Sequence, residues 1–132
     1  MAEPIALNTA GPHSPEYTAQ VANALAEAVR VLNYATLGDA PGLEYPGDVY
    51  TLLGSLYTAT GRLSQLLTQA AAFVKSQEPR LADANGDNVH VQVLLADSYL
   101  TGSASLAGHV TVLLQQAQNA ISGLYLNGDT NG

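Results

Sequence analysis

The stretch PGDVYTLLGSLYTATGRLSQLLTQAAAFVKSQEP, residues 46–79, decides the fold. A proline stands in the first turn and Asp48 follows it, which is typical of a helix N-terminus. Pro79 interrupts the pattern, so we predict a helix from Pro46 to Glu78, about 50 Å long. Its apolar residues recur in the heptad pattern of a bundle helix. They are Val49, Leu56, Leu63 and Ala70; Leu52, Ala59, Leu66 and Phe73; and Leu53, Thr60, Leu67 and Val74.

Two further helices are predicted, one on each side of this stretch. Ser14-Pro15-Glu16 supplies a capping hydroxyl, a first-turn proline and an acid, so a helix is expected from Pro15 to Leu37, before Gly38. The polar turn at residues 83–88 can cap a third helix, whose apolar or small residues recur with a mean step of about 3.7. They are Val91, Leu95, Tyr99, Gly102, Leu106, Val110, Leu113, Ala117, Ala120 and Leu124.

These elements predict an all-α fold. Short loops between long helices favour antiparallel neighbours, hence an up-down-up three-helix bundle over residues 14–126. A flexible arm at 1–13 and a disordered tail at 127–132 are expected to flank it. The alternative is a four-helix bundle in which the third element is broken near Gly102, because small and β-branched residues at Thr101-Gly102-Ser103 favour a kink.

Composition excludes several function classes. The 132 residues carry a net charge of -7 and four scattered basic residues, so no cationic stripe is available for nucleic acid or an anionic membrane. The absence of Cys excludes thiolate metal sites and thiol nucleophiles. No apolar run approaches the roughly 20 residues of a membrane span, and no basic and apolar signal-peptide pattern begins the sequence. A cytoplasmic protein is the default expectation.

One face of the central helix has an unusual composition. Residues opposite its apolar stripe are small or aromatic, where a solvated face normally carries Glu, Lys and Gln. Each helical glycine costs about 1 kcal/mol relative to alanine, so close approach of another helix should offset the cost. That helix belongs either to the same chain or to a partner. We call these positions the Tyr/Gly stripe: Tyr50, Gly54, Tyr57, Gly61, Ser64 and Thr68.

Catalytic and metal-binding patterns are weak. The three histidines lack metal-ligand spacing, and the turn Asp83-x-Asn85-Gly86-Asp87 lacks the twelfth-position carboxylate of a calcium loop. No phosphate-binding glycine loop is present, so neither an enzyme nor a cofactor is expected. A regulator that binds a small ligand in the bundle core is an alternative, with His90, Tyr99 and His109 as polar handles.

Two resemblances accompany these patterns. The sequence of residues 45–54 and 62–67 resembles that of small uncharacterised helical proteins of actinomycetes, which are often encoded on mobile elements and carry no known function. The C-terminal Tyr125-Leu126-Asn127-Gly128-Asp129 resembles the Tyr-x-x-x-Asp/Glu signal of type VII secretion substrates, although their Trp-x-Gly turn is absent. This second resemblance implies a secreted helical protein. The leading hypothesis is a non-enzymatic interaction or structural protein, a homodimer or the partner of another helical protein, that associates through the Tyr/Gly stripe.

Overall fold

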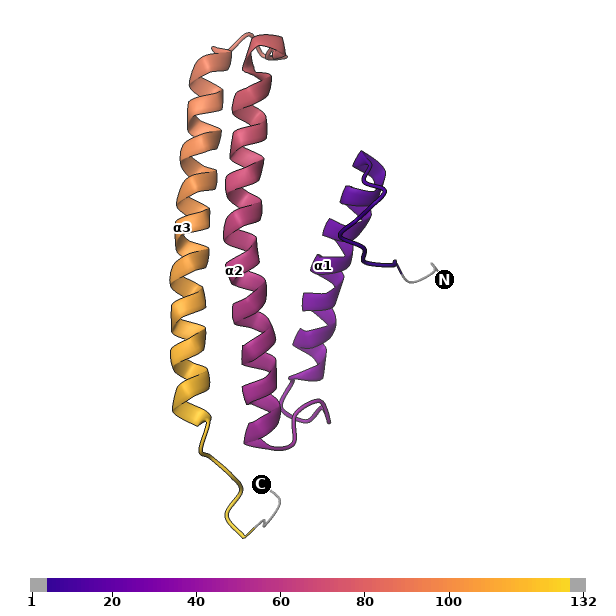
Figure 1. The fold of residues 1–132 in the computed structure, drawn as a ribbon, viewed down its shortest axis with the longest axis vertical. Coiled ribbons are helices and arrows are strands. Elements are labelled where there is room, and N and C mark those ends of the chain that lie inside the picture. The colour runs from indigo at the N-terminus through magenta and orange to yellow at the C-terminus, as the bar shows by residue number, and fades with distance from the viewer. Residues whose placement is uncertain (1–4, 129–132) are drawn as a thin grey trace. The chain divides into compact units, whose positions relative to one another are not determined.

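The computed structural model describes residues 5–128 and is all-α, with three long helices (Figure 1). These are α1 (Pro15–Ala35), α2 (Pro46–Gln77) and α3 (Val89–Ile121), with a short 3-10 turn, η1 (Glu78–Arg80), after α2. The predicted all-α class with three helices is confirmed. By its contacts the chain divides into two compact units, Met1–Glu44 and Tyr45–Gly132. The single domain expected over 14–126 stays a prediction.

In the first unit, residues of the segment 5–13 bond to the start of α1. The flexibility expected of the arm at 1–13 stays a prediction. The Tyr17 hydroxyl donates to the carbonyl of Ala6 at 2.6 Å and accepts from the backbone N–H of Asn8 at 3.0 Å. Ser14 caps α1 as predicted, because its hydroxyl accepts from the N–H of Tyr17 at 3.0 Å. A single tyrosine therefore joins the N-terminal segment to the helix that follows.

In the second unit, α2 and α3 form an antiparallel hairpin and lie side by side along their length (Figure 1). Asp83 shapes the turn between them: its Oδ2 accepts from the N–H groups of Asn85 and Asp87, at 2.8 and 2.9 Å. Asn88 then caps α3 by accepting from the N–H of Val91 at 3.1 Å. The turn at residues 83–88 thus has the capping role that its sequence predicted.

The third element is one continuous helix through Gly102, so the four-helix alternative is wrong. The neighbouring hydroxyls bond within the helix instead of breaking it. Thr101 Oγ1 donates to the carbonyl of Asp97 at 2.8 Å, and Ser103 Oγ donates to that of Tyr99 at 2.7 Å. Such bonds to the preceding turn satisfy small polar side chains without ending a helix.

The apolar positions identified in the sequence along the third helix, from Val91 to Leu124, are not the face of α3 that packs on α2. We call the face of α3 that packs on α2, together with the α2 residues opposite it, the seam. Its buried and half-buried residues include Val93, Leu100, Ala107 and Leu114. On α2 the seam includes Leu53, Thr60, Leu67, Ala71 and Val74. Among the described residues the fully buried ones are small: Ala71, Val93, Ala104 and Ala107. Small side chains let the two helices pack closely, but they bury little apolar area.

Candidate interaction surface

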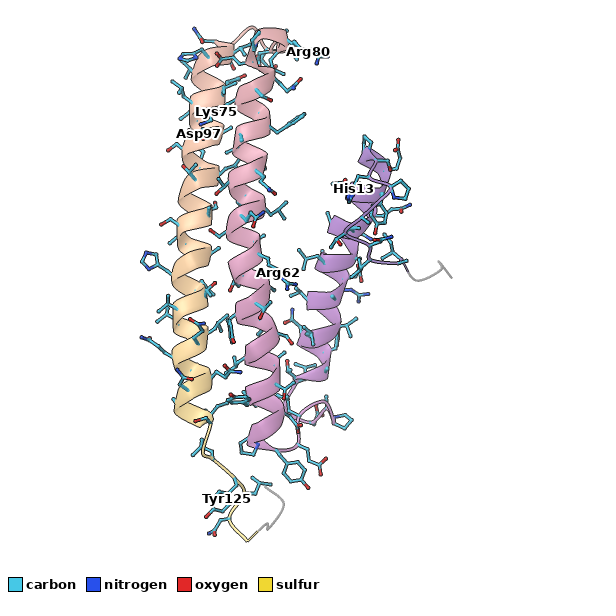
Figure 2. The ribbon with its side chains drawn as sticks, in the orientation of Figure 1. His13, Arg62, Lys75, Arg80, Asp97 and Tyr125 are labelled. Carbon is cyan, nitrogen blue, oxygen red and sulfur yellow. The ribbon has the colours of Figure 1, made fainter. Side chains whose placement is uncertain are left out.

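Polar groups cross the seam at several levels. Thr60 Oγ1 and Thr111 Oγ1 lie 2.6 Å apart, and Ser64 Oγ donates to the carbonyl of Ala104 at 3.0 Å. Towards the turn, Lys75 Nζ lies 3.3 Å from Asp97 Oδ1 (Figure 2). Because these contacts join fixed positions on the two helices, they specify the register of the hairpin.

The Tyr/Gly stripe lies partly against α3 of the same chain. Ser64 bonds to α3, and a Cβ added at Gly61 would sit 3.9 Å from the Thr111 methyl group. A Cβ at Gly54 would sit only 2.9 Å from Gln118 Nε2. The helix that approaches these glycines is therefore α3, as the intramolecular alternative predicted. Tyr50 and Thr68 are exposed and Tyr57 is half-buried; binding of a second molecule at the stripe stays a prediction.

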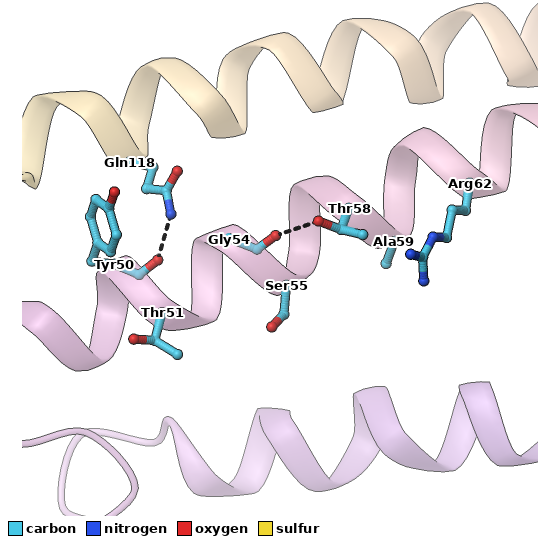
Figure 3. A pocket seen from close by; sticks show the side chains of 8 residues that line it. All are labelled: Tyr50, Thr51, Gly54, Ser55, Thr58, Ala59, Arg62 and Gln118. Carbon is cyan, nitrogen blue, oxygen red and sulfur yellow. Dashed lines mark hydrogen bonds between the residues drawn. The ribbon is translucent and has the colours of Figure 1, made fainter. Parts of the chain in front are cut away.

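An open pocket borders the N-terminal part of this stripe (Figure 3). Gln118 Nε2 donates to the carbonyl of Tyr50 at 3.0 Å, and Thr58 Oγ1 donates to that of Gly54 at 2.9 Å. Arg62 is the one charged group among the lining residues. It is lined by Tyr50, Thr51, Gly54, Ser55, Thr58, Ala59, Arg62 and Gln118.

The three residues proposed to contact a ligand, His90, Tyr99 and His109, do not lie close together. His90 Nδ1 contacts Glu78 Oε1 at 2.9 Å near the turn, while Tyr99 is 72% exposed and His109 is exposed further along α3. Nine or ten residues separate neighbouring members, about 15 Å along a helix. They therefore do not line a bundle core, contrary to the hypothesis of a core ligand.

The other residues proposed from sequence motifs lie apart from the hairpin seam. Tyr125 follows the end of α3 and is exposed. Asp129, the second residue of the secretion-like signal, lies outside the described residues. Within residues 5–128, no group of three or more His, Cys, Asp or Glu side chains is placed to hold a metal ion. The secretion hypothesis thus stays a prediction.

A large apolar surface is formed by residues that belong to the apolar stripes of the second and third predicted helices, and that the structure shows to be exposed. Leu66 and Phe73 of α2 immediately precede the seam residues Leu67 and Val74. Tyr99, Leu106 and Leu113 of α3 likewise precede Leu100, Ala107 and Leu114. A step back of one residue turns a helical position by about 100°, and because α2 and α3 run in opposite directions it turns both sets to the same side. We call this set the open face: Ala59, Leu66, Phe73, Tyr99, Leu106, Val110 and Leu113.

The open face is exposed and carries no charge. Phe73 is 65% exposed, Leu106 is 66% exposed and Leu113 is 64% exposed. From Ser98 to Gly128 the described chain has no Asp, Glu, Lys or Arg. No helix among the described residues is long and apolar enough to cross a membrane. In known proteins, extended exposed apolar patches are often sites of interaction.

No family model, curated protein or solved structure matches the chain.

Proposed function

We propose that this chain is a non-enzymatic interaction protein that self-associates through the open face of the α2–α3 hairpin. The observation that carries the proposal is the row of large, exposed apolar side chains that α3 presents beside α2. The Tyr/Gly stripe has a neighbour in α3, so the side of the hairpin that needs cover is the open face. Its chemistry favours an apolar partner over a charged one.

The dimensions of the open face fit a second copy of the hairpin. With 33 residues, α3 is about 50 Å long, and two packed helices make a face about 20 Å wide. The side of the hairpin that carries the open face therefore measures about 1,000 Å² per copy, which leaves room for the roughly 800 Å² per partner of a standard protein interface. Among the described helices, α1 has 21 residues and is about 32 Å long, whereas α2 and α3 match each other in length. A second copy of the hairpin therefore has the length of the surface that it would cover.

Charge also favours self-association. The whole chain carries a net charge of -7, which opposes contact between copies through most of its surface. The open face contains none of these charges, so two copies can meet there without placing carboxylates against each other. Burial of large apolar side chains on both copies would supply the free energy of association.

Light scattering of the purified full chain across micromolar concentrations tests the proposal. We expect a dimer, and we expect Leu113→Asp to raise the dissociation constant by about a hundredfold or more, because one apolar side chain per copy is replaced by a charge. Val112→Asp is the matched control: Val112 is 51% exposed but follows the seam residue Thr111, so it turns to the other side. A monomeric wild-type chain at high micromolar concentration, or equal effects of the two variants, would contradict the proposal.

A further inference from the structure

We infer that two copies of this chain meet α3 against α3 in antiparallel orientation, with the two-fold axis at Leu106. The inference rests on the proposed self-association and adds its geometry. Leu106 stands at the centre of the open-face residues of α3, which run from Tyr99 to Leu113. A contact that pairs one surface with itself is the commonest way for a soluble protein to form a dimer.

The sizes of the residues along α3 favour the antiparallel arrangement. With the axis at Leu106, Gly102 of one copy lies opposite Val110 of the other. Leu95 then lies opposite Ala117, so in both pairs a small residue faces a larger one, as close packing requires. In a parallel pair each residue would face itself, which would leave a gap at the two glycines.

The surroundings of Gly102 leave room for this contact. A Cβ built on Gly102 has no neighbouring atom within 4 Å, so the helix surface is open at that point. Tyr99, one turn earlier, is 72% exposed and would lie opposite Leu113 of the second copy. The tyrosine ring supplies broad contact area, and its hydroxyl can stay at the rim of the interface.

The distribution of charge favours the same orientation. Charged groups of the hairpin gather near its turn, from Lys75 to Asp97, where four acidic residues outnumber two basic ones. A parallel pair would bring these two acidic ends together. In an antiparallel pair each acidic end lies beside the uncharged residues 115–128 of the other copy. The two ends are then about 50 Å apart, several Debye lengths at physiological salt.

Single cysteines test the orientation, because the natural chain contains none. Leu106→Cys should form a disulfide-linked dimer on mild oxidation of the full chain. A mixture of Tyr99→Cys and Leu113→Cys chains should form the mixed dimer, whereas each alone should link slowly. Linking at Leu106 should be about a hundredfold faster than in the Val112→Cys control, because association raises the local thiol concentration from micromolar towards millimolar.

Each outcome separates the geometry from the proposed function. Fast linking of Tyr99→Cys with itself indicates a parallel pair and overturns the inference, while the self-association stands. A dimer by light scattering that links neither at Leu106 nor in the mixture also overturns the geometry, provided that each variant keeps the wild-type dissociation constant. A monomer overturns both. If a cysteine variant changes the dissociation constant, Ser103→Cys is used in its place. Ser103 borders the axis, so a short crosslinker that joins two thiols should link Ser103→Cys to itself faster than Val112→Cys.

Discussion

The two sides of the α2–α3 hairpin differ sharply although the same two backbones form both. On one side several residues that follow the seam are small or polar: Gly61 lies near the Thr111 methyl group, and Lys75 forms an ion pair with Asp97. On the other side the residues that precede the seam are large and apolar, and they are exposed. One step along a helix therefore separates a side that makes polar contacts within the hairpin from the exposed apolar side for which we propose a partner.

The largest expected effect comes from the seam that divides the two sides. Ala104 is 6% exposed, and its carbonyl accepts from Ser64. Ala104→Leu should lower the free energy of unfolding by about 1–3 kcal/mol, because the larger side chain forces the closely packed helices apart. The measurement is urea denaturation followed by circular dichroism.

Leu106→Ala is the counterpart of that variant on the open face. At dilutions where light scattering finds a monomer, it should change the free energy of unfolding by less than about 0.5 kcal/mol, because surface positions contribute little to stability. A larger loss from Leu106→Ala than from Ala104→Leu would mean that the seam and the open face have been assigned the wrong way round.

A smaller effect, of opposite sign, is expected on the polar side. Gly61→Ala should stabilise the chain by about 0.5–1 kcal/mol, since alanine favours helix and its Cβ would meet the Thr111 methyl group at an ordinary distance of 3.9 Å. Gly54→Ala should gain less, because its Cβ would displace the Gln118 amide from the carbonyl of Tyr50. Urea denaturation of the pair measures this difference, and a destabilised Gly61→Ala would show that the helices pack more closely there than described.

The smallest effect concerns the turn that joins the two helices. The backbone N–H of Asp87 donates to the Asp83 carboxylate and lowers the pKa of Asp83. A lowered pKa means that the ionised form stabilises the fold at neutral pH, and that this contribution is lost as the pH falls below about 4. Thermal unfolding between neutral and acidic pH should show a slightly steeper loss of Tm in the natural chain than in Asp83→Asn. Parallel curves would argue against the capping role.

The sequence predicted the helices well because their ends carry local signals. Ser14 and Asn88 cap α1 and α3 where expected, and Pro46 begins α2. The helix faces were harder to predict, because α3 is apolar over more than half of its circumference. Val93, Leu100 and Ala107 share one helical period, and Leu95, Leu106 and Leu113 share another, so periodicity does not choose between them.

The small residues among the leucines and valines of the seam were a partial signal that could have helped to separate these two faces. The seam pairs small residues from both helices, such as Ala71, Ser64, Ala104 and Ala107, whereas the open face collects Phe73, Tyr99 and leucines. Close helix packing favours the small set. The composition of the Tyr/Gly stripe indicated a close neighbour, but a single sequence does not show from which direction a helix approaches. For this reason a helix of the same chain and an external partner both stayed open as alternatives there.

The scarcity of basic residues has a practical consequence for experiments. Lys75 is the single lysine of the sequence, and it lies on the polar side, beside Asp97. An amine-reactive dye would therefore mark each hairpin at one known position and leave the leucines of α3 unmodified. Beyond Arg80 the sequence has no site for trypsin, so digestion would release α3 in one piece, ready for mass spectrometry with any crosslink that it carries.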